Sequence, residues 1–92
     1  KNGQGYGAGL MVPILAYHLP VINELDFIID ENKDKLNKRF SNLNPLIKDL
    51  KKLDLNKPVL ITSVSTKEAG RNIFNKLSNL GIKDICLPST VI

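Results

Sequence analysis

The sequence predicts an α/β fold, a small Rossmann-like three-layer domain with a mostly parallel sheet of about four strands. Short apolar runs at 25–30, 58–64 and 84–87 have the composition of buried strands. Helical patterns alternate with them, which implies parallel strands joined by right-handed crossovers. Four glycines within residues 3–9 stand where a first strand would turn into a helix. All 92 residues are expected to form one domain.

The first half of the chain predicts a helix and a strand after the glycines. Residues 10–19 are apolar on nearly every side, which favours a helix buried against the sheet, and Pro20 ends it. Residues 25–30 predict a strand covered on both faces that ends at Asp30. The polar segment 33–44 is expected to be mostly loop.

The next segment has two interpretations. Asn44 and Pro45 have the residue types of an N-cap and a first helical position, which predicts a helix to about Leu53. A short edge strand at residues 46–47 is the alternative.

The last third of the chain predicts a strand, a helix and a strand. Residues 58–64 are β-branched and apolar, which indicates a strand. Ser65 and Glu68 form a capping box for a helix with an apolar face at Ala69, Ile73, Leu77 and Leu80. Gly81 is the expected C-terminal cap, and residues 84–87 are the last strand.

Composition and charge exclude several classes of function. The longest apolar run, 8–17, is shorter than the ~20 residues of a membrane span, so no membrane is expected. Residues 33–57 hold eight Lys or Arg, but three Asp interrupt them and the chain has five aromatics, which favours a solvated face over nucleic-acid binding. The lone cysteine, Cys86, indicates a buried thiol and a cytoplasmic protein. Because the chain begins at Lys1, we expect a fragment of a longer protein.

Three loops, at residues 5–9, 30–32 and 63–66, are expected to meet at the carboxyl edge of the sheet, where doubly wound folds bind ligands. Glycines let the backbone approach a phosphate, and a carboxylate at the end of the second strand can accept hydrogen bonds from ribose hydroxyls. The same carboxylate argues against a 2′-phosphate, because like charges would face each other. The candidate nucleotide- or substrate-binding residues are Gly5, Tyr6, Gly7, Ala8, Gly9, Asp30, Asn32, Ser63, Ser65 and Thr66.

The glycine motif departs from the dinucleotide-binding pattern. In G-x-G-x-x-G aligned on Gly5 and Gly7, the third glycine would be residue 10, which is Leu10. A glycine turn without any ligand is therefore one interpretation, and cofactor or nucleotide contact is the other. His18 has no metal-ligand partner at suitable spacing, and Tyr6 has no neighbouring lysine in the sequence. No catalytic residue and no metal site are expected in this fragment.

Several segments together have the order of a known domain: Gly-Tyr-Gly-Ala-Gly at 5–9, an apolar helix, Phe-Ile-Ile-Asp-Glu-Asn-Lys-Asp-Lys at 27–35, Pro-Leu-Ile at 45–47, Val-Leu-Ile-Thr at 59–62 and Leu-Gly-Ile-Lys-Asp-Ile at 80–85. Over nearly its whole length the chain resembles the C-terminal Rossmann-like domain of sugar C-methyltransferases. The resemblance implies a larger enzyme whose other domains hold zinc, S-adenosylmethionine and the catalytic groups. This domain would help to bind a nucleotide-linked sugar.

A second resemblance is to the small nucleotide-binding domain that begins bacterial polysaccharide-biosynthesis proteins, including nucleotide-sugar dehydratases and sugar acyltransferases. It shares the Gly-Ala-Gly at 7–9 and the strand ending in Asp30. It implies a domain that binds NAD or another nucleotide. A structural or interaction domain without a ligand is the third hypothesis.

Overall fold

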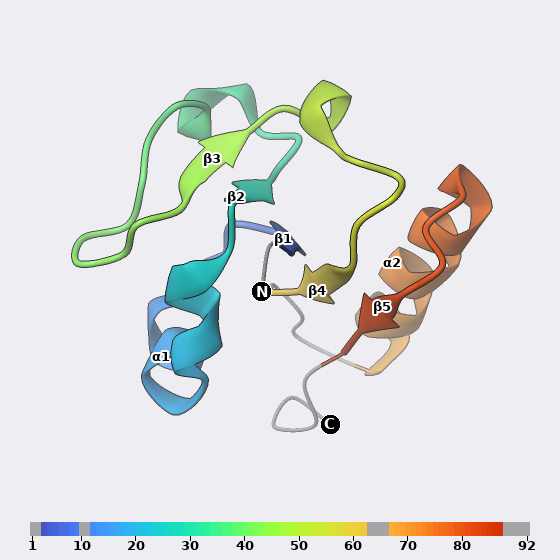
Figure 1. Ribbon diagram of the computed structural model, residues 1–92, viewed down its shortest axis with the longest axis horizontal. Coiled ribbons are helices and arrows are strands. Elements are labelled where there is room, and N and C mark those ends of the chain that lie inside the picture. Colours follow the sequence, from blue (N-terminus) through green and yellow to red (C-terminus); the bar gives the residue numbers. More distant parts are fainter. Residues whose placement is uncertain (1–2, 10–11, 63–66, 88–92) are drawn as a thin grey trace.

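The core of the molecule is a sheet of five parallel strands in the order β3-β2-β1-β4-β5. The computed structural model describes residues 3–9, 12–62 and 67–87 (Figure 1). The predicted α/β class is confirmed, with one strand more than expected. The strands are β1 (Gln4–Tyr6), β2 (Phe27–Ile29), β3 (Leu46–Lys48), β4 (Val59–Ile61) and β5 (Ile85–Cys86).

Two helices cover opposite faces of the sheet, α1 (Val12–His18) and α2 (Lys67–Leu80) (Figure 1). Neighbouring strand residues point to different faces, so the core is divided into two clusters. Ile28 packs with Val12 and Leu15 on the α1 side, whereas Ile29 packs with Leu77 on the α2 side. The domain therefore has the predicted three layers, and β1 lies in the middle of the sheet.

The segment after Pro45 is a strand, and the predicted helix to Leu53 is wrong. Strand β3 pairs with β2 in parallel, with Ile28 opposite Ile47, and Ile47 is 4% exposed. A single 3-10 turn, Leu50–Lys52, follows it. Hydrogen bonding to the open edge of β2 and burial of a β-branched side chain outweigh a weak local helix signal. The alternative assignment, a short edge strand, is the one that the structure has.

Helix α1 packs against the sheet as predicted, but only one of its apolar sides is buried. Val12 and Leu15 face the sheet, whereas Ile14 is 53% and Tyr17 is 83% exposed. A helix that packs on one sheet with nothing above it can bury only one face. A 3-10 helix, Pro20–Glu24, follows and leads the chain toward β2. In the described part of the chain, no helix has the length and apolar character needed to cross a membrane.

Helix α2 is amphipathic and ends as predicted. Leu77 is fully buried, and Leu80, expected on the same face, is 41% exposed. The helix closes with a Schellman motif: the Gly81 N–H donates to the Ser78 carbonyl, and the Ile82 N–H donates to the Leu77 carbonyl. Ser65, the expected N-cap, lies outside the described residues.

Strand β5 forms one edge of the sheet, and its position corrects the expectation for the cysteine. Cys86 is exposed, not buried. An edge strand has a neighbour on one side only, and α1 lies over the other half of the sheet, as Figure 1 shows. The apolar residues around Cys86 in the sequence therefore did not imply a buried thiol.

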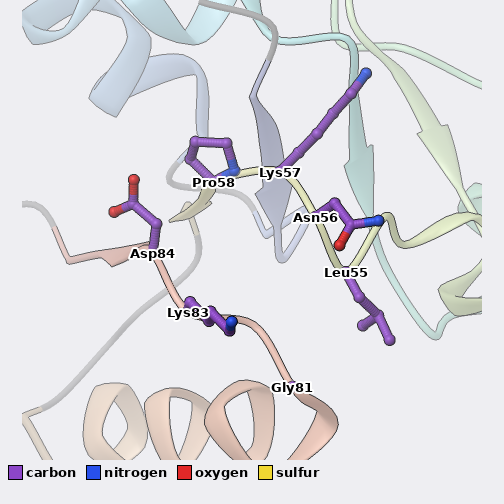
Figure 2. A pocket seen from close by; sticks show the side chains of 7 residues that line it. All are labelled: Leu55, Asn56, Lys57, Pro58, Gly81, Lys83 and Asp84. Atoms are coloured by element: carbon purple, nitrogen blue, oxygen red, sulfur yellow. The ribbon is translucent and has the colours of Figure 1, made fainter.

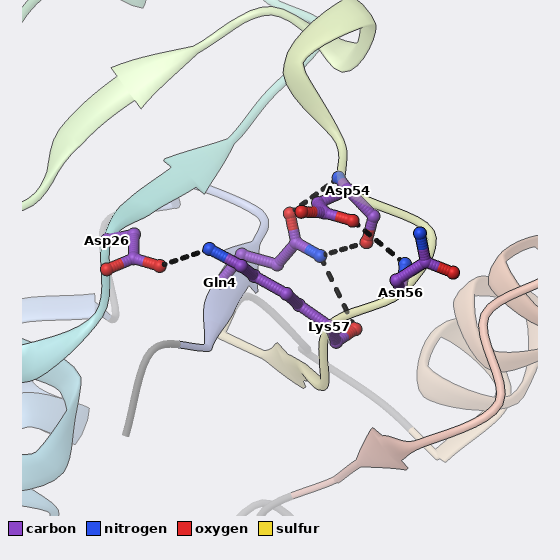
Figure 3. A network of polar contacts seen from close by, with 5 residues as sticks. All are labelled: Gln4, Asp26, Asp54, Asn56 and Lys57. Atoms are coloured by element: carbon purple, nitrogen blue, oxygen red, sulfur yellow. Dashed lines mark hydrogen bonds and ion pairs between the residues drawn. The ribbon is translucent and has the colours of Figure 1, made fainter.

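The amino end of β1 is fixed by a buried amide, Gln4, which is 0% exposed (Figure 3). Its Nε2 donates to the Asp54 carbonyl at 2.6 Å, and its Oε1 accepts from the Asp54 N–H at 3.0 Å. The two hydrogen bonds attach the loop before β4 to β1. Nearby, Lys57 Nζ forms an ion pair with the Asp26 carboxylate at 3.3 Å.

Candidate functional site

The candidate site lies at the carboxyl ends of β1, β2 and β4. The chain leaves β1 for α1 on one face and leaves β4 for α2 on the other, so the crevice between these strand ends is the topological switch point. The structure brings together two of the three predicted loops, 5–9 and 30–32. The third loop, with Ser63, Ser65 and Thr66, lies outside the described residues.

Asp30 holds the glycine loop directly. Its Oδ2 accepts a hydrogen bond from the Ala8 N–H at 2.7 Å, and its Oδ1 accepts from the Asn32 N–H at 2.7 Å. Asn32 in turn accepts from the Asp34 N–H at 3.0 Å and caps the 3-10 helix Lys33–Lys35. The predicted companions, glycine loop and carboxylate, are therefore in contact, and each carboxylate oxygen keeps a lone pair for a further donor.

Two further side chains hold the carbonyl groups of the loop. Lys35 Nζ donates to the Ala8 carbonyl at 2.8 Å, and the Thr62 hydroxyl donates to the Gly7 carbonyl at 2.6 Å. With Asp30, they fix the loop from three sides before any ligand arrives. Neither residue was a candidate from the sequence. Thr62 directly precedes the candidate Ser63, and Lys35 lies in a polar stretch where nothing local distinguishes it from other lysines.

The glycines of the loop have different roles. Gly7 has a φ of +105°, a conformation that side chains rarely adopt, and makes the turn out of β1. Gly5 lies within β1, opposite Ile28 and Leu60, and is buried. A Cβ at Gly5 would meet three side-chain carbons at 3.2 Å. A side chain at position 5 would therefore crowd the packing inside the sheet.

A second polar cluster lies on the α2 side of the same strand ends. The Tyr6 hydroxyl donates to Glu31 Oε2 at 2.8 Å, and Lys76 Nζ forms an ion pair with the same oxygen. Lys76 Nζ also lies 5.6 Å from the centre of the Tyr6 ring. The sequence offered no lysine next to Tyr6, yet the fold supplies one from α2.

The ionisation of this cluster follows from its contacts. Burial raises the pKa of Tyr6 above its ordinary value of 10.0, although its contact with Lys76 opposes the rise. The Lys76 hydrogen bond lowers the pKa of Glu31, and the same bond raises the pKa of Lys76. Tyr6 is thus a protonated donor at neutral pH, and Glu31 and Lys76 are a charged pair. A raised pKa disfavours Tyr6 as a general base.

The amino edge of the sheet carries an open hollow of about 530 Å³ (Figure 2). It is lined by Leu55, Asn56, Lys57, Pro58, Gly81, Lys83 and Asp84. The Lys57 ammonium is paired with Asp26, which does not line the hollow. The hollow lies before β4 and β5, opposite the edge where parallel α/β sheets bind ligands. The carboxyl edge therefore remains the candidate site.

Within the described residues, no group of three or more His, Cys, Asp or Glu side chains is placed to hold a metal ion. Comparison with protein-family models, curated proteins and solved structures finds no match. The residues at the carboxyl edge therefore remain the basis for assigning a function.

Proposed function

We propose that the chain is the nucleotide-sugar-binding domain of a larger sugar C-methyltransferase and is not catalytic by itself. The observation that carries the proposal is the hydrogen bond between the Asp30 carboxylate and the Ala8 N–H. It places an acceptor for sugar hydroxyls beside a glycine loop that a phosphate can approach. Both groups lie at the switch point of a doubly wound sheet, where such ligands bind.

The geometry favours a ligand with hydroxyl donors near Asp30. The carboxylate accepts one hydrogen bond on each oxygen within the protein, and each oxygen can accept another from a ribose or hexose hydroxyl. A phosphate at that position would face the negative charge. The phosphates of a nucleotide-linked sugar therefore belong on the side of the glycine loop that faces away from Asp30.

The rest of the proposal follows the resemblance. We place the catalytic groups, S-adenosylmethionine and zinc in the remaining domains of the parent enzyme, which are this domain's partners. The residues at the candidate site supply binding and orientation of the sugar nucleotide. A cytoplasmic location fits the single cysteine, which has no partner in the chain for a disulfide.

Two other functions each have one observation in their favour. An acid at the end of β2 beside a glycine loop is also where a dinucleotide-binding domain contacts the ribose of NAD, which supports the polysaccharide-biosynthesis alternative. The Asp30 carboxylate is already hydrogen-bonded within the protein, which supports a structural turn without a ligand.

Amide chemical shifts separate the three functions. The domain is titrated to millimolar concentration with UDP-glucose and, separately, with NAD. We expect UDP-glucose to shift amides at residues 7–9 and 30–32, and NAD to shift them less. Stronger shifts with NAD would favour the second function. No shift at these residues with either ligand would refute both binding functions and leave the structural one.

A matched pair of variants tests the role of Asp30. Asp30→Asn removes the charge at the carboxyl end of β2, and Asp26→Asn does the same just before its amino end. We expect Asp30→Asn to weaken UDP-glucose binding about tenfold, the value of one charge-assisted hydrogen bond, and Asp26→Asn to leave it unchanged. Equal affinity in both variants would contradict the proposed contact.

A further inference from the structure

The end of β2 divides two consecutive carboxylates between the two faces of the sheet. Asp30 turns to the α1 side, where it holds the glycine loop. Glu31 turns to the α2 side, where it meets the Tyr6 hydroxyl and Lys76. Both residues follow Ile29, the last residue of β2, and they continue the alternation of side chains along that strand. The carboxyl edge therefore has a second polar cluster, Tyr6–Glu31–Lys76, on the opposite face of the sheet from Asp30.

This cluster places a positive charge at the carboxyl edge, near the ring of Tyr6, which is the last residue of β1. Lys76 Nζ lies 5.6 Å from the centre of the Tyr6 ring, and Tyr6 directly precedes Gly7. The Lys76 side chain is 45% exposed, so its ammonium is accessible to a ligand in solution. The lysine reaches this position from α2, on the opposite side of the sheet from α1.

The partner of Lys76 is one that a ligand can replace. Lys35, another lysine at this edge, donates to a backbone carbonyl that belongs to the loop itself. Lys76 instead pairs with Glu31, whose side chain is 51% exposed. Exposed ion pairs contribute little to stability, and a phosphate offers more charge and more acceptor oxygens than a carboxylate.

Tyr6 lowers the free-energy cost of separating Glu31 from Lys76. When Lys76 turns to a ligand, the Tyr6 hydroxyl still donates to Glu31 Oε2. The carboxylate is also half exposed and can be hydrated. Glu31 therefore does not become an unpaired buried charge, which would be costly.

We propose, on the basis of the proposed function, that Lys76 binds a phosphate of the nucleotide-linked sugar. Its ion pair with Glu31 breaks, and the phosphate takes the place of the Glu31 carboxylate. The ligand is then a nucleoside diphosphate derivative whose phosphates lie on the α2 side of the glycine loop. Its hydroxyl groups lie on the side of Asp30. Glu31 holds the Lys76 ammonium at the crevice before the ligand binds and competes with the ligand for it.

The proposal predicts opposite effects for the two members of the ion pair. Lys76→Gln removes the phosphate contact, and we expect UDP-glucose to bind about five- to tenfold more weakly. Glu31→Gln removes the competing carboxylate, and we expect binding to become about two- to threefold tighter. Lys83→Gln and Glu24→Gln, which change exposed residues near the amino edge, serve as matched controls with unchanged affinity. Uridine, which has no phosphate, should bind all five proteins equally.

The measurements are the UDP-glucose titration by amide shifts and the thermal midpoint of each variant. A purely structural ion pair would lower the thermal midpoint of both variants alike and would change their affinity in the same direction. That result, or unchanged affinity in Lys76→Gln while the unaltered domain binds at residues 7–9, would overturn this inference and leave the proposed function intact. An unaltered domain that shows no shifts would overturn the proposed function and this inference together.

Discussion

Replacing Gly5 by alanine tests whether this glycine is required by packing. The new Cβ would lie 3.2 Å from Ile28 Cγ1, Leu25 Cδ1 and Thr62 Cγ2. Carbon atoms pack best at about 3.5–4.0 Å, so the three neighbours, two on residues 25–28 and one just after β4, would each have to move by a few tenths of an ångström. Overpacking of a buried site costs about 1–3 kcal/mol, and the lower entropy of the unfolded alanine chain offsets about 0.4–1 kcal/mol of this.

We therefore expect Gly5→Ala to lower the free energy of unfolding by about 1–2 kcal/mol, which is about 4–15 °C in Tm for a domain of this size. Gly3→Ala is the matched control in the same segment. Its Cβ would lie 3.5 Å from the Pro58 carbonyl oxygen and 3.7 Å from Leu25 Cδ2, which are ordinary contacts. We expect Gly3→Ala to change stability by less than about 0.5 kcal/mol or to raise it slightly.

Urea unfolding followed by far-ultraviolet circular dichroism measures both variants, because the chain has no tryptophan for a fluorescence assay. The slope of the free energy against urea should stay constant, so that the midpoint reports stability. A Gly5→Ala protein as stable as the unaltered domain would refute the packing argument. Equal destabilisation by both substitutions would also refute it, since only Gly5 has the close contacts.

Two further predictions concern the polar groups that join segments of the sheet. Gln4→Met keeps the volume of the side chain but leaves the Asp54 N–H and carbonyl without their partner. We expect the free energy of unfolding, measured with urea, to fall by about 2–4 kcal/mol. An unchanged urea midpoint would contradict this. For the Glu31–Lys76 pair, the pKa of Glu31 is lowered in the folded state. The contribution of the pair to the free energy of unfolding is therefore fully present above the ordinary pKa of 4.5 and is lost as the pH falls through the lowered pKa. Glu31→Gln should abolish this loss of stability at acid pH, which is at most about 1 kcal/mol for an exposed pair. If the variant loses as much stability below pH 4.5 as the unaltered domain, the loss comes from other carboxylates.

The class of fold could be predicted because several levels of the sequence agree. Alternating strand and helix patterns, Gly81 as a helix end and the strand ending in Asp30 all lead to the same parallel sheet. Strand β3 could not be predicted with the same certainty. Only two apolar residues, Leu46 and Ile47, indicate it, and Asn44 and Pro45 before them also fit a helix start. Its structure depends on hydrogen bonds to β2 that no local signal encodes.

The candidate site was predictable where it depends on strand ends. The carboxyl ends of parallel strands share one edge, and so Asp30 was expected beside residues 5–9, as the structure has it. Lys35, Thr62 and Lys76 were missed. Each acts through a contact with a distant segment, and an exposed lysine on α2 looks the same in the sequence whether or not its ammonium reaches Tyr6.

Outside residues 46–48, the sequence by itself determined the order of strands and helices, and it determined the glycine turn after β1 and the carboxylate that follows β2. These features follow from local periodicity and from residue types that few conformations tolerate. Only the tertiary structure decided that 46–48 is an edge strand, that the outer face of α1 and the thiol of Cys86 are exposed, and that Glu31 joins Tyr6 to Lys76. Those outcomes depend on which surfaces meet across the sheet, and contact between distant segments is a property of the whole packed chain.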